Sequence, residues 1–146
     1  CAPHVSYTGE IGLIKILTSQ SHRGGVRITL VCGKPAYEDY SDKYVLDYCS
    51  SVGFRLEDCA NEIKEEKYSQ AESTVSKILT EWEKKDIILS VFIGDSSIIE
   101  PQKSIISIDN SRGDKNYSYC LFAIRECQGY FHEIYENTQT NLGNVL

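Results

Sequence analysis

Residues Tyr117–Glu126, YSYCLFAIRE, form the stretch of sequence on which the choice of fold class depends most. Side chains alternate along it, so that Cys120, Phe122 and Ile124 fall on one side of an extended chain. Alternation with a period of two is typical of a strand with one buried face. The stretch therefore predicts a strand whose core face carries these three residues.

The segments around this stretch predict further strands. Short apolar runs rich in Ile, Val and aromatic residues are separated by turn residues, which is the usual pattern of a sheet. Together with Tyr117–Glu126 they predict a C-terminal antiparallel meander. The other expected strands are Ile87–Ile93, Ser104–Ile108 and Gly129–Tyr135.

The N-terminal part of the chain predicts a β-hairpin. Two apolar segments, residues 11–17 and 26–32, flank a loop that contains Gly24 and Gly25. Val26, Ile28 and Leu30 alternate with Arg27 and Thr29. We therefore expect an apolar and a polar face.

The middle third changes to a helical period. Tyr44, Val45, Tyr48 and Cys49 share a helical face, and Gly53 is expected to lie beyond the end of that helix. Residues 56–63 repeat the same spacing. A further helix is expected over residues 70–84, because Ser69 and Glu72 have the spacing of a capping box.

Strands, helices and then strands predict one α+β domain over residues 1–146. Its sheet is mainly antiparallel, formed by the N-terminal hairpin and the C-terminal meander, with two or three helices in the middle third. The alternative is a flavodoxin-like three-layer α/β fold. That fold would have strands at 26–32, 53–57 and 87–93 and helices at 42–51 and 70–84.

Six cysteines in a chain of 146 residues predict a disulfide-stabilised domain in an oxidising compartment. The alternative is a cytosolic α/β domain in which all six thiols are reduced. No Cys-x-x-Cys pair is present, so we expect no metal site and no cofactor. The cysteines concerned are Cys1, Cys32, Cys49, Cys59, Cys120 and Cys127.

Charge and processing signals point to a secreted, extracellular protein. The formal net charge of -6 argues against nucleic acid as the main partner, because binding to phosphates requires basic surfaces. Asn116-Tyr117-Ser118 is a sequon for N-glycosylation. A first residue that is Cys and not Met is typical of a processed chain, and no apolar stretch is long enough to span a membrane.

Two segments are candidate binding sites. Arg112-Gly113-Asp114 is the tripeptide known from integrin ligands, and it falls between two expected strands, although a polar turn is the plainer interpretation. Tyr37 and Tyr40 lie in an acidic segment that suits an interface if it is exposed. The alternative is a helix whose tyrosines are buried and whose acidic face is exposed to solvent.

Enzymatic signals are weak. His132 could act as a general base with a carboxylate of a neighbouring strand, as in small secreted ribonucleases. Gly94-Asp95-Ser96 has only a superficial likeness to an esterase nucleophile loop. The sequence therefore favours a binding module that recognises a protein or a cell-surface partner, with a small secreted hydrolase as the alternative.

Overall fold

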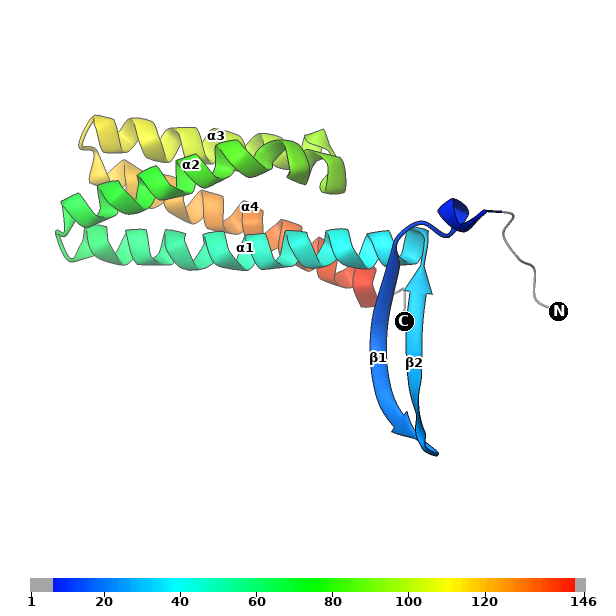
Figure 1. Cartoon of the computed structure of the whole chain (residues 1–146). Coiled ribbons are helices and arrows are strands. Elements are labelled where there is room, and N and C mark those ends of the chain that lie inside the picture. The colour runs from blue at the N-terminus through cyan, green and yellow to red at the C-terminus, as the bar shows by residue number, and fades with distance from the viewer. Residues whose placement is uncertain (1–6, 144–146) are drawn as a thin grey trace.

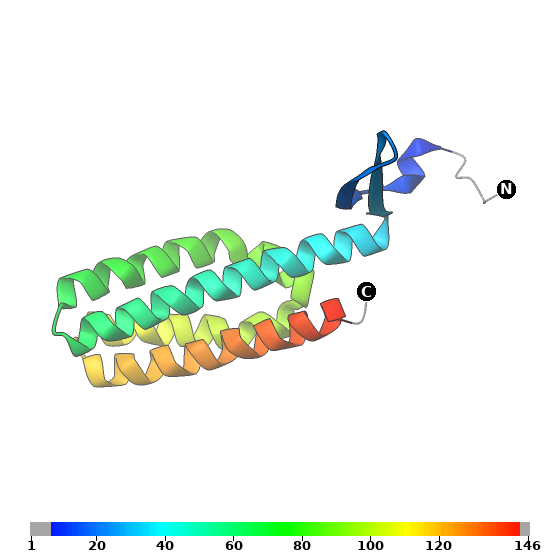
Figure 2. The ribbon, with the colours of Figure 1, turned by 90° about the horizontal axis from the view of Figure 1, so that it is seen from below.

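The computed structural model describes residues 7–143, which form four long helices and a β-hairpin that projects from one end of them (Figure 1). Each helix packs antiparallel to the next, and the last helix closes the bundle against the first (Figure 2). The elements are η1 (Thr8–Ile11), β1 (Ile14–His22), β2 (Gly25–Cys32), α1 (Lys34–Lys64), α2 (Tyr68–Ile93), α3 (Asp95–Gly113) and α4 (Tyr117–Gly143).

The expected C-terminal meander is wrong, because its last two strands are both part of the single helix α4. The core side chains of α4 recur at helical spacing, and each of them is at most 3% exposed. Phe122, expected in the core, is 53% exposed instead. The α+β class is therefore wrong, and the fold is a helical bundle with a small hairpin. The helical stripe consists of Cys120, Ala123, Ile124, Cys127 and Phe131.

The expected strands in the middle of the chain are also helical, which removes the flavodoxin-like alternative. Residues 87–93 form the last two turns of α2, where Leu89 is buried and Ile87 and Val91 face solvent. Residues 104–108 lie within α3. Gly53 does not end a helix but lies inside α1, which continues to Lys64.

Local signals explain where α1 begins but not where α2 begins. Pro35 occupies the first turn of α1, where its missing N–H is not needed. Gly33 precedes the helix with φ 67°, a backbone region that favours glycine. The capping box expected at Ser69 and Glu72 is not formed, since α2 begins at Tyr68, two residues before the expected start, and has Lys67 as its N-cap.

The disulfide-stabilised core is wrong for the described part of the chain. All five cysteines within residues 7–143 are free thiols, and Cys1 lies outside the described residues. Four of the five thiols are buried between helices as small apolar side chains. Packing therefore replaces the covalent links that the cysteine count predicted. The buried thiols are Cys49, Cys59, Cys120 and Cys127.

The N-terminal hairpin is present. β1 and β2 pair antiparallel from Ile14 opposite Cys32 to His22 opposite Gly25, and a bulge lies between Ile16 and Thr18. Gly24 has φ 85° in the turn, a conformation that favours glycine. At the other end of the hairpin, the Gly33 N–H donates to the Leu13 carbonyl at 2.9 Å. Gly33 is the single residue between the end of β2 and the start of α1.

Candidate functional site

The hairpin has one uncovered apolar face, which we call the apolar hairpin face. Its five aliphatic side chains are 50–65% exposed, although they lie on the same side of paired strands. Most apolar side chains of this size are buried in folded proteins. This face therefore resembles one side of a hydrophobic core that has no second layer packed against it. It consists of Ile14, Ile16, Val26, Ile28 and Leu30.

The opposite face of the hairpin is polar, and at the base of the hairpin this face is directed toward the bundle. Lys15 lies on this face and forms an ion pair with Asp39 of α1. Val31, opposite Lys15 in the ladder, is partly buried. Farther along, Arg27 Nη2 lies 3.3 Å from His22 Nε2. Since the polar face meets α1, the apolar hairpin face is the one left open.

Tyr37 and Tyr40, the predicted binding tyrosines, lie at the start of α1 beside the hairpin. Their side chains are 46% and 56% exposed. The ring of Tyr37 contacts Phe92 of α2 edge-on, with the centroids 6.0 Å apart. Tyr40 therefore belongs to the exposed surface at the hairpin end, while Tyr37 also helps to pack α1 on α2.

The structure places Arg112, Gly113 and Asp114 at the C-terminal end of α3, far from the hairpin. Arg112 Nη1 donates to Ser76 Oγ of α2 at 2.9 Å, and its Nη2 pairs with Asp109. The guanidinium is thus engaged by its own fold, while Asp114 is exposed. Binding through this tripeptide stays a prediction.

Asn116, the predicted glycosylation site, lies in the exposed turn before α4. Its Oδ1 accepts a hydrogen bond from the Tyr119 N–H at 3.2 Å, which satisfies a free backbone donor of the first turn. The residue therefore has a structural role as a helix cap. Glycosylation and the secreted location stay predictions.

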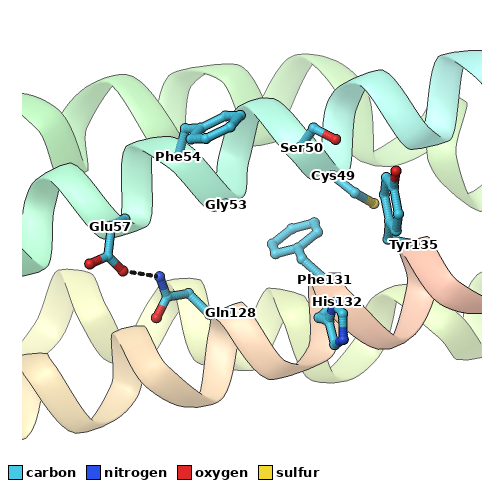
Figure 3. Close-up of a pocket in the computed structure, with 9 residues that line it drawn as sticks. All are labelled: Cys49, Ser50, Gly53, Phe54, Glu57, Gln128, Phe131, His132 and Tyr135. Atoms are coloured by element: carbon cyan, nitrogen blue, oxygen red, sulfur yellow. Dashed lines mark hydrogen bonds between the residues drawn. The ribbon is translucent and has the colours of Figure 1, made fainter.

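A groove runs between α1 and α4 on the outside of the bundle (Figure 3). It encloses about 400 Å³, which lies within the usual range for small-molecule sites. Its floor is apolar, because it is formed by the side chains of Phe131 and Cys49, which are 3% and 4% exposed. The α1 wall consists of Cys49, Ser50, Gly53, Phe54 and Glu57, and the α4 wall consists of Gln128, Phe131, His132 and Tyr135.

Gly53 keeps the centre of the groove open. A Cβ atom placed there would meet no atom within 4 Å outside its own helix, so neither close packing nor a positive φ requires glycine. A glycine in a helix interior costs about 1 kcal/mol relative to alanine. The neighbouring Phe54 leaves 74% of its side chain exposed along the groove. The groove therefore has free space above Gly53 next to the accessible ring of Phe54.

The polar groups of the groove are divided between its two ends. At one end, Gln128 Nε2 donates to Glu57 Oε2 at 3.1 Å. Within residues 7–143, Glu57 forms no ion pair, and Arg55, two residues earlier in α1, pairs instead with Glu81 of α2. At the other end lie His132 and Tyr135 (Figure 3). Burial raises the pKa of the Cys49 thiol to about 12, which keeps the floor uncharged.

His132, the predicted general base, shares the groove with Glu57 but does not contact it. Figure 3 shows Gln128 and Phe131 between the two residues. His132 is exposed and lies on a helix, not on the expected strand. The hydrolase alternative therefore has no acid–base pair here and stays a prediction. The sequence feature that could have indicated the groove is Gly53, which stands next to Phe54. Because Gly53 was expected to lie beyond the end of a helix, the sequence did not predict a groove there.

Among residues 7–143, no cluster of three or more His, Cys, Asp or Glu side chains has a metal-binding arrangement. No helix in the same range has both the length and the apolar character needed to cross a membrane.

Residues 40–145 match the model of a protein family described as a domain of unknown function, DUF4363. The match begins in the second turn of α1, so it covers most of the bundle but not the hairpin. No curated protein and no solved structure matches the chain. Because the match covers well over half of its length, the chain belongs to the DUF4363 family.

Proposed function

We propose that the chain is a protein-binding module that self-associates through its apolar hairpin face. The observation that carries this proposal is the exposure of five aliphatic side chains on one side of a paired sheet. Contiguous exposed apolar patches of this kind usually mark interaction sites.

The hairpin needs a cover for physical reasons. An isolated two-stranded sheet is marginally stable in water and becomes stable when its apolar side packs on another layer. Among the described residues, the bundle meets the hairpin mainly at the hairpin's base, where Lys15 pairs with Asp39 and β2 contacts α1. A partner that covers the apolar hairpin face would complete its core.

A second copy of the chain fits this face better than an unrelated surface. Two-fold symmetry would pack the same five side chains against themselves, so each copy supplies the complement of the other. Lys15 and Arg27 project from the opposite face, so no like charges would meet across such an interface. Because Lys15 of the polar face pairs with Asp39 of α1, α1 lies on the polar side and does not cover the apolar hairpin face.

The test measures self-association by sedimentation equilibrium. The wild-type chain should form a dimer, and Ile28→Asp should raise the dissociation constant at least about 100-fold. One buried isoleucine contributes roughly 1.5–3 kcal/mol, and the symmetric interface contains two of them. Thr29→Asp is the matched control, because it places the same charge on the polar face of the same strand.

Two results would contradict the proposal. One is a wild-type chain that stays monomeric at the highest concentration that remains soluble. The other is a dimer that is weakened equally by Ile28→Asp and by Thr29→Asp. Circular dichroism of each variant confirms that the helices are intact, so that a loss of association is not a loss of folding.

A further inference from the structure

The groove between α1 and α4 lies outside the apolar hairpin face and has a different chemistry. Its walls combine aromatic rings with one carboxylate that has no cationic partner within residues 7–143. We propose that this groove binds an organic cation, an ammonium or guanidinium group carried on an apolar body. The cationic group lies at Glu57 and the body lies over Gly53 between Phe54 and Phe131.

The charge of the occupant follows from Glu57. Its carboxylate accepts a hydrogen bond from the neutral amide of Gln128, which fixes its position and leaves its charge uncompensated. A cation that reaches this oxygen gains a charge-assisted hydrogen bond. The part of the bundle formed by residues 37–100, which includes the α1 wall of the groove, is acidic, with fifteen acidic and seven basic side chains, and this also attracts cations and repels anions.

The shape of the occupant follows from the rings and from Gly53. Phe54 is 74% exposed, so an apolar body contacts mainly this ring, while Phe131, which is 3% exposed, lies beneath it as part of the groove floor. Aromatic faces also attract cations. Because no side chain projects from Gly53, the space between the rings admits a group of the size of a benzene ring or a branched alkyl chain.

The cation can come from a free amine or from a basic side chain of a peptide, and the shared chemistry is tested first with small probes. The probes are 2-phenylethylamine, which is an ammonium ion at neutral pH, the neutral 2-phenylethanol, and the anionic 3-phenylpropanoate. They carry the same ring and differ mainly in charge. A short peptide with a Phe-Arg sequence then tests the second source.

Trp82 supplies the readout, as the single tryptophan of the chain. Its ring contacts Phe131 edge-on, with the centroids 6.0 Å apart, so a change at the groove floor reaches the fluorophore. Fluorescence titration gives the dissociation constant of each probe, and calorimetry provides an independent value. We expect the ammonium to bind about 3–10-fold more tightly than the alcohol, and the carboxylate to bind most weakly.

Two variants test the location. Glu57→Gln should remove the preference for the ammonium and leave the binding of 2-phenylethanol unchanged. Gly53→Leu should abolish the binding of all three probes, because its side chain fills the groove. Gly129→Leu is the matched control, since Gly129 is also a helix-interior glycine with open space around it but does not line the groove.

Several outcomes would overturn the proposal. Equal affinity for the three probes would show that charge plays no part, and tightest binding of 3-phenylpropanoate would reverse the assignment. Unchanged binding in Gly53→Leu, or equal loss in Gly129→Leu, would place the binding elsewhere. No saturable signal with the amine or with the Phe-Arg peptide would exclude a cation site.

Discussion

At the scale of single residues, the hydroxyl of Tyr48 is a weak point of the core. The side chain is 2% exposed, and its oxygen has no hydrogen-bond partner among the described residues. Burial raises the pKa of this phenol above its usual range. The ring itself packs well, since it contacts Phe131 edge-on with the centroids 5.9 Å apart.

Replacement of Tyr48 by Phe should therefore stabilise the protein. A buried polar group without a partner costs about 1–3 kcal/mol, so we expect Tyr48→Phe to raise the free energy of unfolding by about 1 kcal/mol. Urea denaturation followed by Trp82 fluorescence measures this change. Tyr44→Phe serves as the control and should have little effect, because Tyr44 is only partly buried. A clear loss of stability in Tyr48→Phe would reveal a partner for the hydroxyl.

The buried thiols predict a loss of stability at alkaline pH. Burial raises the pKa values of Cys49, Cys59 and Cys127 from 9.0 to about 12. Stability from these groups is complete below pH 9 and is lost as the pH rises toward 12, because only the unfolded chain releases these protons. Each thiol should remove roughly 1 kcal/mol between pH 9 and pH 10. Burial also raises the pKa of the fourth buried thiol, Cys120. Urea midpoints measured across this range test the slope, and Cys49→Ala should reduce it by about a quarter to a third.

At the scale of elements, the turn between α2 and α3 depends on a single glycine. Gly94 has φ 85°, and it joins two helices with no other residue between them. A Cβ there would contact nothing within 4 Å, so a substitution would act through the backbone alone. Gly94→Ala should lower the free energy of unfolding by about 1–2 kcal/mol. Gly129→Ala should raise it by about 1 kcal/mol, because Gly129 lies inside α4. Equal effects in thermal denaturation would contradict this explanation.

The elements also show what the sequence could and could not predict. The hairpin and the helix around residues 70–84 were predictable, because turn glycines and helical spacing are local signals. The stretch Tyr117–Glu126 satisfies a period of two, but Cys120, Ala123, Ile124 and Cys127 satisfy a helical period equally well. Contacts of α4 with α1 and α3 decide between the two periods, and a local pattern does not contain them. The groove depends on the same contacts, since its walls are about 75 residues apart in the chain.

At the scale of the whole molecule, the hairpin and the bundle are nearly independent. Among the described residues, the two parts meet mainly at the ion pair of Lys15 with Asp39 and where β2 contacts α1. A partly exposed ion pair at the protein surface contributes about 0–1 kcal/mol. A chain that starts at Lys34 should therefore keep the stability of the monomer within about 1 kcal/mol and lose self-association. Urea unfolding and sedimentation measure the two effects separately, and a loss of several kcal/mol would show that the hairpin supports the bundle.

An even number of antiparallel helices gives the molecule two unlike poles (Figure 1). The hairpin, the start of α1 and the end of α4 share one pole, while the turns at 65–67 and 114–116 form the other. A surface linkage at Lys115, in the second pole, would immobilise the protein with its hairpin directed away from the support. The same linkage at the end of α4 would hold the hairpin against the support. The topology thus determines which attachment points keep the proposed interface accessible.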